Sequence, residues 1–102
     1  MTPLEKDIER KLREMVEKHG GRCLKWVCPG WAGVPDRLIL LPGGRVIFAE
    51  TKRPKGGVLS ARQKRWRAIL QALGFWYTVV WTLEDVKQLE VCIQVALAEP
   101  WK

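Results

Sequence analysis

The feature that most constrains this chain is a pair of apolar runs on either side of a Pro-Gly-Gly break. The first run covers residues 38–41 (LILL), and the second lies within residues 45–52 (RVIFAETK). Large aliphatic and β-branched residues flanking such a break predict a β-hairpin. Antiparallel pairing brings the start of one strand beside the end of the other, so Asp36 should lie close to Glu50 and Lys52. Because side chains alternate along a strand, Glu50 and Lys52 should point the same way, roughly 6.6 Å apart.

This group of two carboxylates and one ammonium has two interpretations. The ordinary one is a salt bridge at a strand end, which is common for adjacent acidic and basic side chains. The other is a site for a hard divalent cation, because Mg²⁺ takes oxygen ligands from one or two carboxylates and fills its other positions with water and phosphate. The otherwise apolar strand and the Pro35-Asp36 step, which fixes the turn, favour the cation site. The spacing of these residues leaves both interpretations open.

Pro35-Asp36, followed after a hairpin-length gap by Glu50-Thr51-Lys52, resembles the PD-(D/E)xK nuclease signature. The wider chain resembles one branch of that superfamily, the VRR-NUC (virus-type replication-repair nuclease) domains. A bare P-D…E-x-K recurs by chance, whereas six ordered pieces in so short a chain are specific. The pieces, which extend from Glu5 to about Val86, are Glu5 with Ile8, Gly20-Gly21 before Lys25, Gly33-Val34-Pro35-Asp36-Arg37, Phe48-Ala49-Glu50-Thr51-Lys52, Ser60-Ala61-Arg62-Gln63, and Gly74 ahead of a last strand.

The resemblance implies an α/β fold, with a restriction-endonuclease-like α-β-β-β-α-β core, a mixed central sheet flanked by helices, and a C-terminal helix. Residues 1–102 should form a single VRR-NUC-like domain. The order of patterns agrees, because an antiparallel meander would be followed by a strand that returns across a helical crossover. The expected elements are a helix from Thr2 to Gly20-Gly21, a strand over 22–28, the hairpin, a helix opened by Ser60 with Trp66, Ile69, Leu70 and Leu73 inward, a buried strand over 75–81, and a helix opened by Thr82.

The activity that the resemblance implies is metal-assisted phosphodiester hydrolysis. Asp36 and Glu50 would hold Mg²⁺ or Mn²⁺, with the backbone carbonyl of Thr51 as a further oxygen ligand. Lys52 would lie beside the attacking water and the developing charge on phosphorus, where a fixed cation is most useful.

The nuclease pattern usually adds a glutamate from the first helix, and Glu5 and Glu9 both qualify. Glu5 falls about 50° from the centre of the apolar stripe and Glu9 about 90°, so Glu5 should lie nearer the sheet. Glu5 also matches the family position, which favours it as a catalytic residue or a metal ligand, either direct or through water. Its alternative role is to close a capping box with Thr2. Gln63 is equally open: it either orients water or substrate, or caps its own helix.

The formal net charge of +7 and a pI near 9.7 favour a polyanionic partner such as DNA. Many basic proteins bind no nucleic acid specifically, but here the cations follow directly after the acidic site. Lys25 and Arg37 are further candidates for DNA contact, although a solvated strand residue is the ordinary alternative. The clustered cations are Arg53, Lys55, Arg62, Lys64, Arg65 and Arg67.

Two other sequence features remain ambiguous. Trp31 lies in the loop before Asp36, where it could stack on an unpaired base, close a subunit contact or simply pack the loop. The three cysteines form no C-x-x-C pair, so we expect reduced thiols rather than disulfides. Zinc bound by His19 with these cysteines does not match the usual ligand spacings.

No apolar segment approaches the roughly 18 residues of a membrane span, and no signal peptide opens the chain, so we expect a cytoplasmic protein of a bacterial cell or phage-infected host. The resemblance further implies a homodimer acting on branched DNA, such as four-way (Holliday) junctions or flaps. The alternatives are a catalytically weak DNA-binding module with the nuclease fold, or a nuclease subunit of a larger replication or repair complex. Intact Asp36, Glu50 and Lys52 argue against the weak module.

Overall fold

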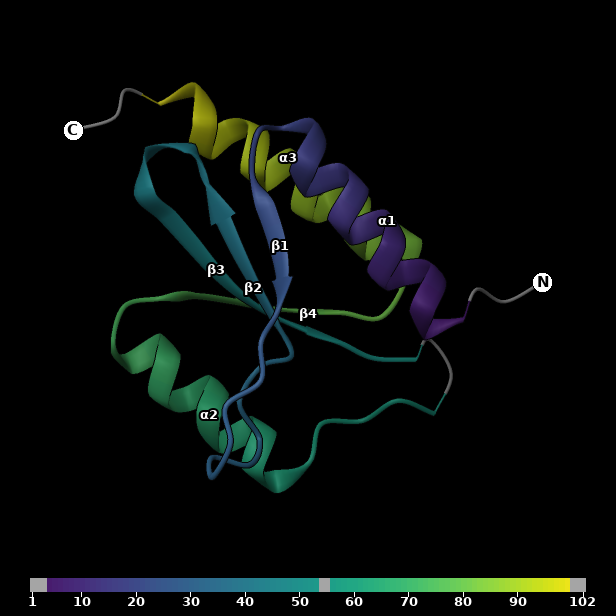
Figure 1. Cartoon of the computed structure of the whole chain (residues 1–102), viewed down its shortest axis with the longest axis vertical. Coiled ribbons are helices and arrows are strands. Elements are labelled where there is room, and N and C mark those ends of the chain that lie inside the picture. Colours follow the sequence, from purple (N-terminus) through teal and green to yellow (C-terminus); the bar gives the residue numbers. More distant parts are fainter. Residues whose placement is uncertain (1–3, 54–55, 100–102) are drawn as a thin grey trace.

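The computed structural model describes residues 4–53 and 56–99. It consists of one sheet and the helices that pack on it (Figure 1). In chain order the elements are α1 (Glu5–Lys18), β1 (Arg22–Lys25), β2 (Arg37–Leu41), the short 3₁₀ turn η1 (Pro42–Gly44), β3 (Arg45–Thr51), α2 (Ala61–Ala72), β4 (Trp76–Val80) and α3 (Leu83–Ala98).

The four strands form a mixed sheet in the order β1-β2-β3-β4. β1 pairs antiparallel with β2, and β2 antiparallel with β3. β4 then returns parallel to β3 after the α2 crossover, with Glu50 opposite Val79 and Thr51 opposite Val80. The predicted α/β fold with a mixed central sheet is therefore confirmed.

The predicted hairpin is also present, and its register places the start of β2 beside the end of β3. Arg37 pairs with Ala49 and Leu41 with Arg45. The reversal at the other end needs Gly43 and Gly44, whose φ angles of 81° and 74° lie in the left-handed region that glycine adopts without a Cβ clash. Asp36 immediately precedes β2, so the hairpin delivers it beside the last residues of β3.

Two apolar clusters pack on opposite faces of the sheet. α1 and α3 cover one face and α2 the other (Figure 1). Alternation along β3 assigns its side chains to the two clusters: Ile47 and Ala49 belong to the α1–α3 side, and Phe48 to the α2 side. By the same alternation, Glu50 points towards the α2 side and Thr51 towards α1.

The starts of α2 and α3 follow the predicted capping chemistry. The Ser60 hydroxyl accepts a hydrogen bond from the Gln63 N–H at 3.1 Å, and the Gln63 amide oxygen accepts one from the Ser60 N–H at 2.8 Å. Thr82 and Asp85 make the equivalent pair at α3. Such reciprocal bonds satisfy backbone donors that the first turn of a helix leaves free. None of the described helices is long and apolar enough to cross a membrane.

The start of α1 differs from the prediction. Thr2 and Pro3 lie outside the described residues, and the helix begins at Glu5 with Leu4 in the N-cap position. The Asp7 carboxylate, rather than that of Glu5, accepts the hydrogen bond from the Leu4 N–H at 3.1 Å. The Glu5 side chain is therefore not used at the cap in the described part of the chain.

Three further expectations were wrong. The first strand ends at Lys25 rather than at residue 28, because its pairing partner β2 begins at Arg37. Leu73 is 67% exposed, since it follows the last helical residue where the chain turns at Gly74. β4 is an edge strand, so the run over 75–81 is buried only at Tyr77 and Val80.

Candidate metal and DNA site

Asp36 is fixed to the end of β3 by two hydrogen bonds from one residue. The Thr51 backbone N–H donates to Asp36 Oδ1 at 3.0 Å, and the Thr51 hydroxyl donates to Asp36 Oδ2 at 2.7 Å. Thr51 itself is 1% exposed. The backbone of Asp36 is held as well, since its carbonyl accepts a 2.8 Å hydrogen bond from the Trp26 N–H. The turn aspartate is thus held in one position relative to the strand.

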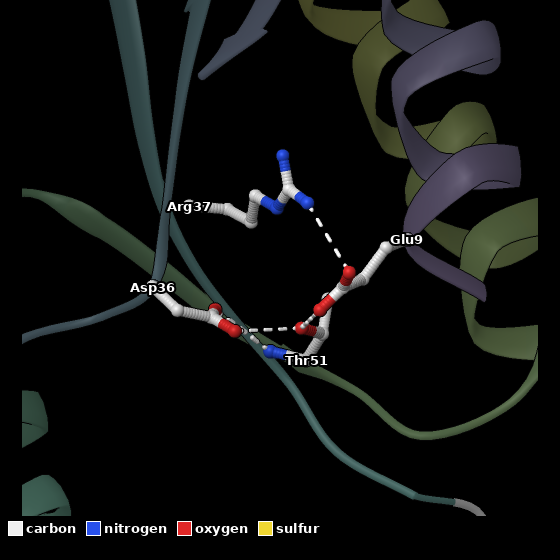
Figure 2. A network of polar contacts seen from close by, with 4 residues as sticks. All are labelled: Glu9, Asp36, Arg37 and Thr51. Atoms are coloured by element: carbon white, nitrogen blue, oxygen red, sulfur yellow. Dashed lines mark hydrogen bonds and ion pairs between the residues drawn. The ribbon is translucent and has the colours of Figure 1, made fainter. Parts of the chain in front are cut away.

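Glu9 reaches the same threonine from α1. Its Oε1 lies 3.1 Å from the Thr51 hydroxyl, and its Oε2 lies 3.3 Å from Arg37 Nη2 (Figure 2). A hydroxyl carries one proton, and ionised carboxylates only accept, so Thr51 can donate to Asp36 or to Glu9 but not to both at once. One carboxylate oxygen is therefore always left facing the hydroxyl oxygen without a hydrogen bond.

Three carboxylates converge at this end of the sheet. Oxygens of Glu5, Glu9 and Asp36 lie within 4.8 Å of one another, and they form the only cluster of His, Cys, Asp or Glu side chains in the described chain that is compact enough to hold a metal ion. Like charges at such distances repel unless a cation compensates for them. Arg37 supplies one positive charge, through its contact with Glu9.

The helix periodicity predicted that Glu5 lies nearer the sheet than Glu9, whereas the structure brings both glutamates to Asp36. Glu9 also contacts Thr51 and Arg37. The angle of Glu9 from the apolar stripe did not predict this position. The first turns of α1 extend past the core to the end of β3, where the helix meets polar partners rather than apolar ones.

Glu50 lies outside that cluster but next to it. The residue is 3% exposed, and its Oε2 is buried without a hydrogen-bond partner. Burial, and then the negative charge of Asp36, raise the Glu50 pKa to about 7 against the opposing effect of Lys52. Buried polar atoms in folded proteins nearly always have a partner, so an orphan oxygen beside acidic neighbours fits a site that binds a cation.

Tyr77 has the only other buried side-chain polar atom without a partner in the described residues, its hydroxyl oxygen. Burial raises the Tyr77 pKa to about 12, and the nearby charge of Glu50 adds to the effect. Tyr77 pairs with Phe48 across the parallel strands, so it lies on the same face as Glu50. Tyr77 falls within the predicted buried strand over 75–81, and nothing in the local pattern distinguishes it from its neighbours.

Lys52 lies just beyond β3, where its backbone N–H donates to the Val80 carbonyl at 3.0 Å. Its side chain lines a small pocket of about 210 Å³ together with Glu5, Arg53 and Gly57. A Cβ on Gly57 would lie 2.5 Å from the Arg53 carbonyl oxygen, so Gly57 packs directly against the backbone of Arg53, two residues after β3. Lys52 therefore lies in the same corner of the molecule as the acidic cluster.

The other predicted site residues have different surroundings. Gln63 uses its amide oxygen in the capping box, as its structural alternative proposed. The Arg37 guanidinium contacts Glu9 and is 14% exposed, so it is directed at the acidic cluster rather than at solvent. Lys55 lies outside the described residues. The remaining candidates for DNA contact are exposed, namely Lys25, Arg53, Arg62 and Lys64.

The cysteines and His19 do not form a metal site. All three thiols are free, and burial raises the pKa of Cys23 to about 11. His19 instead contacts the Glu90 carboxylate at 2.7 Å. Cys23 is buried, Cys28 is half-buried and Cys92 is exposed.

Comparisons with known proteins agree with this architecture. No family model matches the sequence. A phage protein named "Putative nuclease p44", from Acyrthosiphon pisum secondary endosymbiont phage 1, is 49% identical over 70 residues, which cover 69% of this chain and 74% of that protein. A solved structure titled "VRR_NUC domain" matches with a TM-score of 0.79 and 28% identity, over 83% of this chain and 91% of its own.

The fold and these two relatives place the chain among the nucleases, which act on nucleic acid as hydrolases. Within that class, it belongs to the VRR-NUC family.

Proposed function

We propose that this chain is a DNA endonuclease that uses Mg²⁺ or Mn²⁺ to hydrolyse phosphodiester bonds in branched DNA, such as four-way junctions or flaps. The observation that carries the proposal is the convergence of Glu5, Glu9 and Asp36 at the end of β3, near enough to the buried Glu50 for the charges of Asp36 and Glu5 to raise its pKa. Carboxylate oxygens are the ligands that a hard divalent cation prefers. A surface salt bridge would need neither a third carboxylate nor a buried one.

Asp36 and Glu50 would hold the cation, with the Thr51 carbonyl and the α1 glutamates as nearby oxygen donors. A divalent cation bound there supplies Lewis-acid chemistry, polarising a phosphoryl oxygen and making a water molecule more acidic. Thr51 keeps Asp36 in place through its two hydrogen bonds. Outer contacts of this kind commonly affect metal affinity or activity by 10- to 100-fold.

Lys52 would stabilise the negative charge that develops on the phosphoryl group, since it lines the pocket next to Glu5 and Arg53. The compact ammonium of lysine is suited to that point contact, and the planar fork of arginine is not its equivalent. The exposed cations Arg53, Arg62 and Lys64 would bind flanking phosphates.

A homodimer accounts best for action on a junction. One domain of this size presents one acidic site, whereas a two-fold pair presents two sites to opposed strands. Light scattering on the purified protein should therefore give the mass of a dimer, and a monomer that cleaves junctions at full rate would remove this part of the proposal.

The activity is tested by incubating the protein with linear, nicked, flapped and four-way DNA in Mg²⁺, Mn²⁺ or EDTA. We expect metal-dependent cleavage of the branched forms, and a loss of at least about 100-fold in Asp36→Asn and in Lys52→Ala. Glu14→Gln is the matched control, because Glu14 is an exposed α1 residue outside the cluster. Cleavage in EDTA, or full cleavage by Asp36→Asn, would contradict the proposal.

A further inference from the structure

A second pocket lies away from the acidic cluster, between the β1–β2 loop and α2. It measures about 420 Å³, within the roughly 300–1,000 Å³ typical of ligand sites, and its lining includes Trp31, Trp66, Ile69, Arg62 and Arg65. The loop that carries Trp31 extends away from the sheet towards α2 (Figure 1). The same loop ends at Asp36.

Of the two tryptophans of this pocket, Trp66 packs against the apolar cluster on the α2 side of the sheet, whereas Trp31 is largely exposed. Trp31 is 61% exposed, and Trp66 is only partly buried. Their ring centroids are 6.0 Å apart at an interplanar angle of 83°, an edge-to-face contact. Such an edge-to-face contact leaves part of the exposed Trp31 indole uncovered by Trp66. An indole left this exposed on a small domain is available for stacking.

Trp31 is held on a rigid support rather than on a loose loop. Gly33 has a φ of +90°, and a Cβ there would lie 2.7 Å from the carbonyl carbon and Cβ of Arg62. The loop backbone is therefore in direct contact with the first turn of α2. Pro35 is fully buried and Asp36 is bound to Thr51, so the segment after Trp31 is held at Gly33 and again at its end.

The charge around the pocket has one sign. Arg62 and Arg65 line it, and the exposed Lys64 lies between them in sequence. No acidic residue lines this pocket in the described part of the chain. Exposed aromatic faces combined with neighbouring cations are the arrangement by which proteins bind single-stranded nucleic acid, since every base has a face to stack and every nucleotide a phosphate to neutralise.

We propose that this pocket holds an unpaired base of the DNA substrate, stacked on Trp31, with its flanking phosphates at Arg62 and Arg65. The inference rests on the proposed nuclease function and narrows its substrate class to DNA with an unpaired nucleotide near the cleaved bond. A flap fits this description better than a fully paired duplex. Stacking of this kind tolerates any base, so no sequence preference follows from it.

The test is a binding measurement in EDTA, where cleavage is prevented, with three DNAs: a flap, the same flap with an abasic nucleotide at the unpaired position, and a paired duplex of equal length. Trp31→Ala should weaken flap binding by about 5- to 150-fold, which corresponds to roughly 1–3 kcal/mol per stacked base. Its binding to the duplex should change by less than about twofold. Trp31→Phe should retain most of the flap affinity.

The abasic flap provides the decisive comparison. Wild-type protein should lose about as much affinity on removal of the base as on removal of the indole, and Trp31→Ala should not distinguish the two flaps. Val27→Ala is the matched control, because Val27 is 71% exposed in the same loop but does not line the pocket. Arg65→Gln should weaken flap and duplex binding alike. It should also reduce the slope of log affinity against log salt concentration by about one.

Three results would overturn the inference: equal losses on flap and duplex in Trp31→Ala, additive effects of the variant and the abasic site, or conversion of a dimer to monomers by Trp31→Ala. The last result would assign Trp31 to a subunit contact instead.

Failure of the nuclease proposal gives a different result from failure of the pocket proposal. A protein that binds flaps through Trp31 but cleaves no DNA refutes the activity alone, whereas one that cleaves DNA but binds equally with and without Trp31 refutes the pocket alone.

Discussion

The hydroxyl of Thr51 lies between two carboxylates, 2.7 Å from Asp36 Oδ2 and 3.1 Å from Glu9 Oε1 (Figure 2). One proton cannot serve both acceptors. This residue therefore links the turn aspartate to the first helix, and it does so in a place where negative charge is in excess.

Thr51→Val should test the role of this hydroxyl, because valine keeps the shape of threonine without its donor. Asp36 would retain its backbone hydrogen bond from residue 51 but lose the shorter one. We expect cleavage of branched DNA to fall by about tenfold and stability to change by about 1 kcal/mol. Thr51→Ser, which keeps the hydroxyl, should cleave nearly as well as wild type. Equal losses in both variants would show that the methyl group matters instead.

Arg37→Gln should make the protein depend on divalent cations for its stability. The Arg37 guanidinium lies 3.3 Å from Glu9 and is 14% exposed, so its removal leaves the carboxylate cluster with less compensation. In EDTA we expect a loss of about 1–3 kcal/mol in urea unfolding, with partial recovery in millimolar Mn²⁺. Arg10→Gln breaks an exposed pair and should have little effect. An equal loss of unfolding free energy by Arg37→Gln in EDTA and in Mn²⁺ would contradict the expected dependence on divalent cations.

Glu50 should make the metal-free protein less stable as the pH rises. Its folded pKa of about 7 exceeds the ordinary value of 4.5, so the folded state binds the proton more tightly than the unfolded state does. Stability is therefore lost between about pH 4.5 and 7, by an amount on the order of 3 kcal/mol at most. Glu50→Gln cannot ionise and should lack this loss.

The measurement for Glu50 is urea unfolding in EDTA at pH 4.5 and pH 8. We expect the stability of Glu50→Gln, relative to wild type, to rise by about 1–3 kcal/mol between the two pH values. Glu14→Gln, at an exposed position on α1, should show no such change. If the difference in stability between Glu50→Gln and wild type stays constant with pH, burial does not raise the pKa of Glu50.

Gly33→Ala should be much more harmful than Gly30→Ala. Both glycines have positive φ, +90° and +84°, so each substitution pays the same backbone cost of about 1–2 kcal/mol. Only at Gly33 would the new Cβ also meet Arg62, at 2.7 Å, whereas nothing lies within 4 Å at Gly30. Overpacking adds about 1–3 kcal/mol, measurable by urea unfolding. Equal effects would show that the loop does not press on α2.

Much of the fold could be predicted because local signals agreed with one another. The Pro-Gly-Gly break, the capping pairs at Ser60 and Thr82, and the apolar run of β3 each indicate an element without knowledge of the rest. The errors occurred where tertiary context decides. The position of β4 at the sheet edge, which leaves Phe75 exposed, cannot be read from an apolar run alone.

The candidate site was predictable only in part, for a similar reason. Strand pairing places Asp36 beside the end of β3 whatever the helices do, so that contact could be inferred from the hairpin. The choice between Glu5 and Glu9 depends on how α1 crosses the sheet, which the helix periodicity does not determine. The Glu50 pKa depends on complete burial, and burial at a strand end is set by packing from elements far away in sequence.

Carboxylates from the turn, the strand and the first helix should together bind a divalent cation. Calorimetric titration of the DNA-free protein with Mn²⁺ tests it most directly, using wild type, Asp36→Asn, Glu50→Gln and the control Glu14→Gln. We expect saturable Mn²⁺ binding by wild type and Glu14→Gln, and binding weakened by about tenfold or more in Asp36→Asn and Glu50→Gln. Unchanged Mn²⁺ affinity in both Asp36→Asn and Glu50→Gln would contradict it.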